Sequence, residues 1–500
     1  MSEQGAVSGG LAKLVEIVHS PPGADWNERN REAFGALFGA PSGRYRKDAE
    51  KLVTVRAPYF EGDSGVPFAA LIHPSNPTSG PYGGMSFVLF PGEEEPCLVA
   101  MVVGTHGLAP DEAILGRPGH ARKMQAIARW LNRAFGTGRQ VAWAKQDPTR
   151  VDIDMPDALR RDWSAYRRIF ERYGKVIYAA YRPSQDRQAT AQALAAFLDV
   201  MFEERGQAPL AGQTSHAKEI RASWFAHLMP SVTRQEVLGL LNRRRFVILE
   251  GPPGTGKTLL AWQILREEYG GRGRSIQFHP GITYENFVGG LAPIHTDGAL
   301  GLHFAPVPGF LMEAAAAALE EPDRPYLLLI DEINRADLSK VLGEAIHLFE
   351  ADPGFDRIVD LAYDFGPPFH RSLRLPRNLH LLGTMNSADR SIAIVDVAVR
   401  RRFAFVTLWP SSEVVAGHGC AAGQRAFERL ISIFVEHASE EALALAPGHS
   451  YFLEKDERKL PERLRTELAP LLREYLAQGY VTGFAEEIRS YLQWLDSLGT

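Results

Sequence analysis

Residues 251–258 read GPPGTGKT, a glycine-rich run that ends in a lysine and a threonine. Glycines let successive backbone N–H groups point inward around phosphates, Lys257 can supply charge to the β- and γ-phosphate oxygens, and Thr258 can offer a hydroxyl to Mg²⁺. The apolar run FVILE precedes this loop and the helical pattern LLAWQILREEY follows it, which is the context in which the motif holds a nucleoside triphosphate. The residues predicted to bind the nucleotide are Gly251, Pro252, Pro253, Gly254, Thr255, Gly256, Lys257, Thr258 and Leu259.

Two adjacent carboxylates, Asp331 and Glu332, follow the apolar run YLLLI at residues 326–330. A carboxylate at the end of a central strand beside such a loop holds the coordination shell of Mg²⁺, and a second one can polarise the attacking water. An apolar run that ends in acidic residues is a weak signal alone, but it is a strong one downstream of a phosphate-binding loop. We therefore expect Asp331 to act with Thr258 at the metal and Glu332 to act as the general base.

Polar groups that could assist hydrolysis lie farther along the chain. The strand-like run NLHLLGTMN ends at Asn386, which can orient the lytic water, although an isolated asparagine after a strand is also a common turn former. The run VRRRF then places Arg400, Arg401 and Arg402 in succession. Arginine matches the charge on a transferring phosphoryl group, whereas three adjacent arginines are otherwise a solvated or acid-paired face. We predict that at least one of them acts as an arginine finger across a subunit interface.

These side chains need strands and helices to bring them together. From about residue 220 the chain alternates β-like and helical runs, which is typical of a parallel sheet with flanking helices, and after Pro410 the pattern is helical. The predicted fold class is therefore an α/β P-loop NTPase core at residues 220–410, followed by a C-terminal helical lid at residues 411–500.

The first part of the chain has a different pattern. Helical spacing at residues 11–38 is followed by the short β-type runs LVTV, VPFAALI, MSFVLF and CLVAMVV, and then by helical spacing again at residues 119–135. This predicts an N-terminal α+β domain, residues 1–185, that contains a small antiparallel sheet. Residues 186–219 combine a helical run with a polar stretch, which indicates a helix and a linker.

The composition is that of an ordinary globular chain. Its 500 residues carry a formal net charge of −5, which excludes a globally basic nucleic-acid coat but not a local basic face. Cys97 and Cys420 lie far apart without a CxxC motif, so neither a disulfide framework nor a zinc site is indicated. The sequence lacks a signal-peptide pattern and a run that could span a bilayer, so we expect a cytoplasmic protein with no membrane partner.

Five segments together resemble, in order and spacing, the AAA+ module of McrB-like restriction motors. They are GPPGTGKT, FHPGITYENFVGG, LLLIDEINRADLSKVLGEAIHLFE, GTMNSADRSIAIVDVAVRRRF and PGHSYF. The resemblance covers about residues 220–500. MNSADRS is its most specific element, because it differs from the MNTADRS signature of that group only at Ser387.

The resemblance implies a ring, expected to be a homo-hexamer, with nucleotide bound between neighbouring subunits. Asn386 would then be sensor 1, and Asp389 and Arg390 would shape the same site. Arg401 or Arg402 would reach the nucleotide of the next subunit.

The same resemblance makes Arg335 a further interface candidate and widens the choice of cofactor. In the type member of the group the nucleotide is GTP, and a separate nuclease subunit, McrC, cleaves the DNA. Most AAA+ relatives use ATP instead. The expected cofactors are therefore ATP or GTP, with Mg²⁺.

The β-rich N-terminal part loosely resembles the N-terminal modules of some McrB-like proteins that read DNA or modified bases. A reader of a flipped base needs an aromatic-lined pocket, and Tyr59, Phe60, Tyr82 and Trp143 could form its walls. The alternative is that these aromatic side chains fill a small core.

Basic residues in the same part fall at helical spacing and could contact DNA phosphates, or could equally form a solvated helix face. They are Arg122, Lys123, Arg129 and Arg133.

The sequence as a whole predicts a Mg²⁺-dependent nucleoside triphosphatase that recognises DNA and works with a separate McrC-like nuclease in a restriction or defence system. The sequence contains no convincing nuclease motif of its own. The alternative is a MoxR-like ATPase that remodels proteins. Salt-dependent DNA binding distinguishes the two hypotheses.

Overall fold

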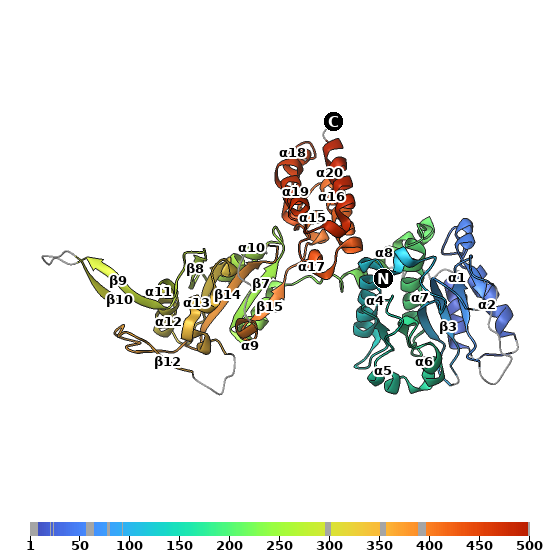
Figure 1. Ribbon diagram of the computed structural model, residues 1–500, viewed down its shortest axis with the longest axis horizontal. Helices are drawn as coiled ribbons and strands as arrows, with labels where there is room; N and C mark the ends of the chain where they lie inside the picture. Colours follow the sequence, from blue (N-terminus) through green and yellow to red (C-terminus); the bar gives the residue numbers. More distant parts are fainter. Residues whose placement is uncertain are drawn as a thin grey trace. The chain divides into compact units, whose positions relative to one another are not determined.

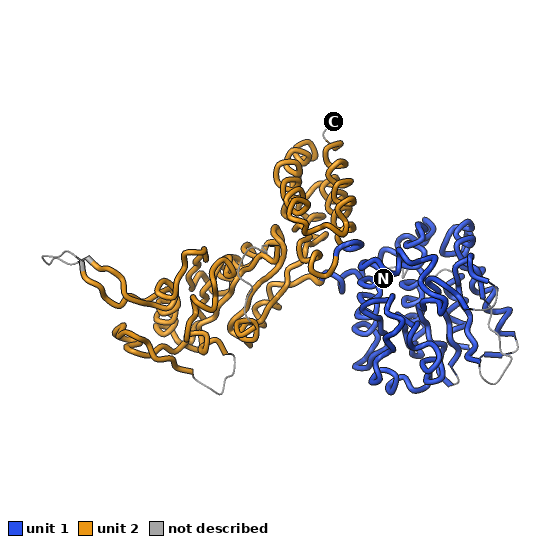
Figure 2. The backbone as a smooth tube through the Cα atoms, viewed as in Figure 1, with its two compact units in different colours: residues 1–229, 435–438 blue, residues 230–434, 439–500 orange. Residues whose placement is uncertain are grey.

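The computed structural model describes residues 9–20, 22–23, 25–56, 65–77, 81–92, 94–295, 302–350, 357–388 and 397–498. The chain divides into two units, coloured separately in Figure 2. Unit 1 takes in residues 1–229 and 435–438, and unit 2 takes in residues 230–434 and 439–500. No helix among the described residues is long and apolar enough to cross a membrane.

Unit 1 is built on an antiparallel sheet with the strand order β1-β2-β3-β4-β6-β5. Its strands are β1 (Thr54–Arg56), β2 (Ala69–Ile72), β3 (Met85–Phe90), β4 (Leu98–Val103), β5 (Ala142–Ala144) and β6 (Ile177–Tyr181). All residues of β2, β3, β4 and β6 are buried, because helices and loops cover both faces of the sheet. The predicted N-terminal α+β fold is thus confirmed, and β5 and β6 extend the expected sheet.

One face of this sheet packs against α5 (Asp157–Asp162) and α6 (Arg167–Tyr173). Alternate residues along a strand point to the same face, so Val88 and Phe90 of β3 share a buried cluster with Trp163. The remaining helices of unit 1 are α1 (Gly9–His19), α2 (Trp26–Gly35), α3 (Glu112–Leu115), α4 (Pro118–Phe135), α7 (Arg187–Glu203) and α8 (Thr214–Phe225).

The segment expected to be a helix and linker, residues 186–219, lies wholly within unit 1. The reason is burial: α7 contacts α1, α4, α8 and β3, and most of its residues are inaccessible to solvent. Asp186 caps this helix by accepting hydrogen bonds from the backbone N–H groups of Gln188 and Ala189. A helix this apolar on all sides is a core element of its unit.

Unit 2 contains a parallel sheet with the strand order β15-β7-β14-β11-β8. Its strands are β7 (Phe246–Gly251), β8 (Gly273–Gln277), β11 (Tyr326–Asp331), β14 (Leu379–Asn386) and β15 (Ala404–Thr407). Two buried clusters, one on each face, hold the helices against it. The α-helices of unit 2 that precede β15 are α9 (Arg234–Arg244), α10 (Lys257–Gln263), α11 (Tyr284–Phe287), α12 (Phe310–Glu320), α13 (Leu338–Leu342) and α14 (Val397–Arg400).

The strand register sets the place of the site. In this sheet Asn386 pairs with Gly251, and β11 lies beside β14, so the carboxyl ends of β7, β14 and β11 meet at one edge. Ligands of open parallel sheets bind outside that edge. The three sequence motifs that end these strands are therefore brought together.

Two further parts of unit 2 complete the fold. A hairpin of β9 (Gly289–His295) and β10 (Leu302–Pro308) extends away from the sheet in Figure 1, and a short pair joins β12 (Val359–Asp360) to β13 (Ser372–Leu373). After the sheet the chain is helical, as expected for the lid. The helices of this subdomain are α15 (Ser412–His418), α16 (Ala421–His437), α17 (Glu440–Leu443), α18 (Leu460–Arg463), α19 (Ala469–Ala477) and α20 (Ala485–Ser497).

Candidate functional site

The phosphate-binding loop joins β7 to α10, which begins at Lys257. Gly254 and Gly256 have φ angles of 81° and 79°, in the left-handed region that residues with a Cβ rarely adopt. The Thr255 hydroxyl donates a hydrogen bond to the carbonyl of Pro252 at 3.0 Å and braces the turn from inside. The glycines at these positions are thus required by the backbone that the loop adopts.

The ammonium group of Lys257 lies inside the loop, with only 7% of the residue exposed. It donates hydrogen bonds to the carbonyls of Gly251 at 2.9 Å and Pro252 at 2.8 Å. Burial lowers the pKa of Lys257 to about 8, although the negative charges of Glu332 and Asp331 act in the opposite direction. The ammonium is therefore held by neutral partners and can exchange them for phosphate oxygens.

Asp331 ends β11 and meets the start of α10. The Thr258 hydroxyl donates to its Oδ1 at 2.9 Å, and the Thr384 hydroxyl of β14 donates to the same oxygen. The backbone N–H of Glu332 in turn donates to Thr384 Oγ1 at 3.1 Å. Thr384 is a residue that the sequence reasoning missed, although it lies two positions before Asn386 on one strand and so faces the same side.

Glu332 lies where β11 turns out of the sheet. Its φ angle is 53°, a conformation that costs a residue other than glycine about 1–3 kcal/mol and that clusters at functional sites. Its Oε1 accepts a hydrogen bond from the Asn386 side-chain amide at 2.8 Å, and its Oε2 lies 3.4 Å from Nε of Arg335. The structure thus brings Glu332 and Asn386 together, and it places Arg335, which the sequence suggested only as an interface candidate, beside Glu332.

The three consecutive arginines have different surroundings. The guanidinium of Arg400 lies 5.1 Å from the ring centroid of Phe405, and Arg401 is exposed. Arg402 is 4% exposed, donates to the carbonyl of Ala398 at 2.8 Å and lies 3.9 Å from Glu350. Of the two arginines expected to reach a neighbouring subunit, Arg401 therefore has the accessible side chain.

The two other residues expected to shape this site, Asp389 and Arg390, lie outside the described residues.

A segment of the helical lid contacts the outside of the phosphate-binding loop. The backbone N–H of Gly448 donates to the carbonyl of Pro253 at 2.9 Å, and that of Ser450 donates to the carbonyl of Gly254 at 3.0 Å. This segment was part of the PGHSYF element in the sequence, but sequence reasoning gave it no role. Only the folded chain shows that it lies against the loop.

Unit 1 contains a cavity of about 500 Å³ that opens at one side of its sheet. Aromatic side chains and two arginines line it, with the Arg56 guanidinium 4.4 Å from the ring centroid of Phe68 and its Nε 3.1 Å from the hydroxyl of Tyr82. Principal lining residues are Arg56, Phe68, Tyr82, Phe90, Arg172 and Tyr173.

Of the four aromatic residues expected to form such a pocket, Tyr82 lines the cavity. Trp143 packs against the buried cluster beside the sheet and is not among the lining residues, so for Trp143 the core alternative holds. Tyr59 and Phe60 lie outside the described residues.

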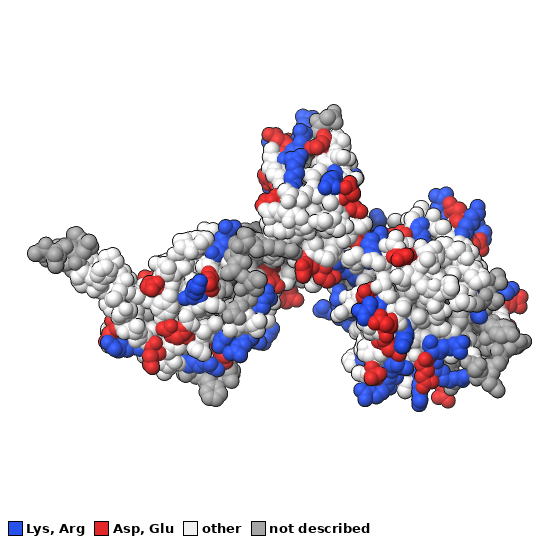
Figure 3. Space-filling model, in the orientation of Figure 1, with Lys and Arg blue, Asp and Glu red and all other residues white. Residues whose placement is uncertain are grey.

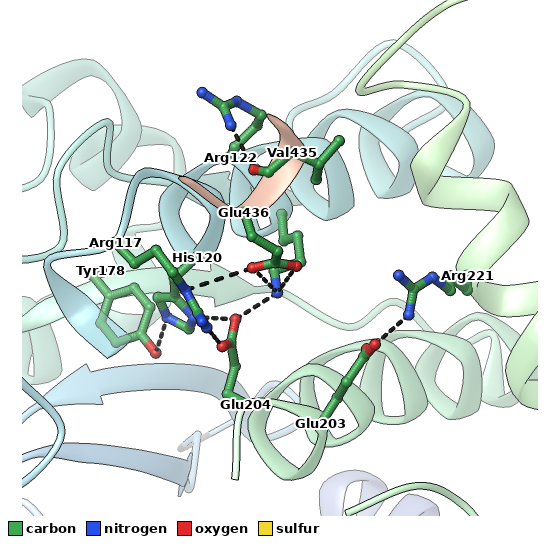
Figure 4. Close-up of polar contacts among 10 residues, drawn as sticks. Arg117, His120, Arg122, Tyr178, Glu203, Glu204, Arg221, Val435 and Glu436 are labelled. Atoms are coloured by element: carbon green, nitrogen blue, oxygen red, sulfur yellow. Dashed lines mark hydrogen bonds and ion pairs between the residues drawn. The ribbon is translucent and has the colours of Figure 1, made fainter. Parts of the chain in front are cut away.

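The suggested phosphate contacts on α4 are wrong for two of the four basic residues (Figure 4). Arg122 and Lys123 are 4% and 2% exposed. Arg122 donates to the carbonyls of Val435 at 2.6 Å and Ala438 at 2.7 Å, and Lys123 contacts carboxylates. The partners come from residues far along the chain, which helical spacing alone cannot reveal. Arg129 and Arg133 are exposed, so the solvated-face or phosphate-contact alternatives both stand for them.

Lys123 belongs to a set of charged residues that we name the buried ionic cluster. Nζ of Lys123 lies 2.6 Å from Glu204 and 2.8 Å from Glu436, and Arg117 pairs with both carboxylates. His120 also faces Glu204, but burial lowers its pKa to about 3, so it is neutral near pH 7. The cluster consists of Arg117, His120, Lys123, Glu204 and Glu436.

Comparisons with known proteins find one family and two relatives that resemble part of the chain. Residues 246–403 match the model of the AAA domain, dynein-related subfamily. The type IV methyl-directed restriction enzyme EcoKMcrB subunit of Escherichia coli (strain K12) is 34% identical over 270 residues, which is 49% of this chain and 57% of that protein. The type II restriction enzyme BsuMI component YdiS of Bacillus subtilis (strain 168) is 26% identical over 265 residues, which is 44% of this chain and 75% of that protein.

This chain therefore spans a little over half the length of the E. coli relative. Membership of an ATPase domain family implies nucleotide binding, and both relatives are components of restriction enzymes. The matched region is also the region whose strand ends carry the phosphate-binding loop and the carboxylates described above. Residues 246–403 are thus similar to AAA domains of the dynein-related subfamily, and the chain resembles the McrB subunit over about half of its length.

Proposed function

We propose that this chain is the DNA-recognising NTPase subunit of an McrBC-like restriction system and that it hydrolyses ATP or GTP with Mg²⁺. The observation that carries the proposal is the meeting of Lys257, the Thr258–Asp331 pair and the Glu332–Asn386 pair at one edge of the parallel sheet. Each of these groups has the chemistry that phosphoryl transfer to water requires, and they come from three different strand ends.

The donor set beside the loop fits a magnesium ion. A hydroxyl and a carboxylate, Thr258 Oγ1 and Asp331 Oδ1, are 2.9 Å apart, and such hard oxygen ligands together with phosphate oxygens suit Mg²⁺. When bound, the ion would neutralise charge that develops on the phosphates. Thr384 holds the orientation of the Asp331 carboxylate through its hydroxyl.

In this proposal Glu332 takes a proton from the attacking water, and Asn386 positions that water. The hydrogen bond from Asn386 orients the Glu332 carboxylate through Oε1, and Oε2 lies 3.4 Å from Nε of Arg335. Asn386 ends β14 and Glu332 directly follows β11, so neighbouring strands bring the two side chains together.

The active assembly we propose is a homo-hexameric ring in which Arg401 of one subunit reaches the nucleotide of the next. Support comes from the exposure of Arg401, because a residue that acts across an interface must extend from its own subunit. Arg402, which directly follows Arg401, is anchored by its hydrogen bond to Ala398 and by Glu350 at 3.9 Å.

DNA recognition is assigned in this proposal to unit 1, and DNA cleavage to a separate McrC-like nuclease. The aromatic-lined cavity supports the first assignment, since a flipped base is held by stacking and by a few polar groups. Lysine and arginine are interleaved with acidic residues over the face of unit 1 seen in Figure 3, so that face does not favour a broad electrostatic contact. A pocket that takes one base is the better supported mode.

The test is steady-state hydrolysis of ATP and of GTP by the full chain, with and without unmodified and cytosine-modified duplex DNA. We expect one class of DNA to stimulate turnover and Arg172→Ala, which alters the cavity lining, to remove the stimulation while leaving basal turnover unchanged. Arg167→Ala is the matched control, because Arg167 lies on the same helix outside the cavity and pairs with Glu171. Turnover that no DNA affects would favour the protein-remodelling alternative.

A further inference from the structure

The lid and the phosphate-binding loop are in close backbone contact. A Cβ added at Gly448 would lie 2.0 Å from the carbonyl carbon of Gly254, and a Cβ added at Gly254 would lie 2.5 Å from Oγ of Ser450. The backbone of residue 448 can approach the loop this closely only because that residue is glycine. The lid segment is therefore seated against the loop at a fixed position.

That fixed position determines where His449 lies. Its Nε2 is 3.6 Å from the point that a Cβ of Gly256 would occupy, at the turn directly before Lys257. The side chain is half-buried, so part of the ring remains open to a ligand. His449 is thus a lid residue at the rim of the phosphate-binding loop.

The tautomer of His449 follows from its hydrogen bond. The backbone N–H of Ser411 donates to Nδ1 at 3.2 Å, so Nδ1 acts as the acceptor. Burial and the nearby His418 lower the pKa of His449 to about 4, so the ring is neutral near pH 7. In a neutral ring with Nδ1 accepting, the proton lies on Nε2, which faces the loop.

We propose that the Nε2–H group of His449 donates a hydrogen bond to an oxygen of the nucleotide bound in the same subunit. The inference rests on the proposed function, since it takes the loop to be the nucleotide site. It adds a binding residue from the lid, so that the affinity for nucleotide depends on the lid being seated on the loop. The acceptor is an oxygen of the phosphates or of the ribose.

The experiment uses two isosteric variants of the full chain. In His449→Gln the amide nitrogen lies near the position of Nε2 and can still donate, whereas in His449→Asn the amide lies near Nδ1 and leaves nothing at Nε2. Binding of Mg·ADP and Mg·GDP is measured by calorimetry, with Lys257→Ala as the variant expected to bind at least about 10²-fold more weakly. The apparent midpoint of thermal unfolding without nucleotide is measured for every variant.

We expect His449→Asn to weaken binding by about 10- to 100-fold, the loss expected for a hydrogen bond to a charged acceptor, and His449→Gln to stay within about threefold of wild type. Inorganic tripolyphosphate distinguishes the acceptors. If its binding weakens in parallel with that of the nucleotides, the acceptor is a phosphate oxygen, and if it is unchanged, the acceptor is on the ribose.

Two results would overturn the inference. Equal affinity of wild type and both variants would show that Nε2 does not contact the nucleotide, and equal weakening in both variants with a lowered unfolding midpoint would show a packing role. If the wild-type protein itself binds neither nucleotide, the proposed function fails instead, and the two failures are therefore distinguishable.

Discussion

Lys123 in unit 1 and Lys257 in unit 2 are both almost fully buried, with 2% and 7% of their surfaces exposed. The ammonium of Lys123 lies within 3.0 Å of two carboxylates, those of Glu204 and Glu436. The hydrogen bonds described for the ammonium of Lys257 go to two backbone carbonyls. Burial is common to both lysines, so the partners are what distinguishes them.

The difference shows how a buried charge is kept available. Near Lys257 the Asp331 carboxylate is held by the hydroxyls of Thr258 and Thr384, and the Glu332 carboxylate is held by other side chains. These contacts orient the two carboxylates so that neither forms an ion pair with the Lys257 ammonium. Removing one partner of a fully paired buried ion destabilises a fold, whereas a buried ion bonded only to neutral groups can still gain by binding an anion.

The largest effect is expected for Lys257→Ala. Loss of two or more hydrogen bonds to charged phosphate oxygens should weaken nucleotide binding by about 10²-fold or more and abolish turnover. Calorimetry and a steady-state hydrolysis assay measure the two quantities, and circular dichroism checks that the protein is folded. Wild-type affinity in this variant would show that Lys257 does not bind the nucleotide.

Glu332→Gln should separate binding from chemistry at the same site. The amide can still accept from Asn386 but cannot take a proton, so we expect the affinity for nucleotide to be kept and kcat to fall by about 10²-fold or more. Turnover at the wild-type rate would show that Glu332 is not the base. Asp331→Asn is the companion variant and should instead make turnover respond to higher Mg²⁺ concentrations.

Lys123→Met tests the structural lysine. The substitution keeps the volume but leaves two buried carboxylates short of a cation, so the free energy of unfolding of unit 1 should fall by about 3–5 kcal/mol. Chemical denaturation followed by circular dichroism measures the change. Because the buried ionic cluster lies outside unit 2, the affinity of the folded protein for nucleotide should stay unchanged. A loss of affinity with no loss of stability would contradict the comparison.

The smallest effect concerns pH. Because the pKa of Lys257 is lowered to about 8, its ammonium is charged below that pH and loses its proton as the pH rises through it. Nucleotide affinity should therefore be full near pH 7 and weaken above pH 8, towards about tenfold per pH unit. Binding measured from pH 7 to pH 10 at constant ionic strength gives the profile. A flat profile would show that the ammonium stays protonated without a ligand.

The sequence was a good guide where function depends on strand ends. The motifs at Lys257, Asp331 and Asn386 each follow an apolar run, and parallel strands bring their carboxyl ends to one edge, so their meeting could be predicted. The predicted fold classes of both halves are confirmed for the same reason, because strand and helix periodicity is a local property.

What could not be predicted depends on contacts between distant residues. The sequence around Lys123 does not indicate that its side chain binds Glu436. The sequence around Gly254 likewise does not indicate that Gly448 packs against it. The surroundings of Arg402 likewise include Glu350, which its place in an arginine run does not indicate. Helical spacing shows which residues share a face but not whether that face is covered.

The inclusion of residues 435–438 in unit 1 has a practical consequence for dissecting the chain. A fragment cut after residue 229 would lose the carbonyls that accept from Arg122 and the backbone of Glu436 on which Gly119 packs. Such a fragment should be poorly soluble by itself. A synthetic peptide that carries the end of α16 should restore it, which would make this small segment a handle for reconstituting the N-terminal half by fragment complementation.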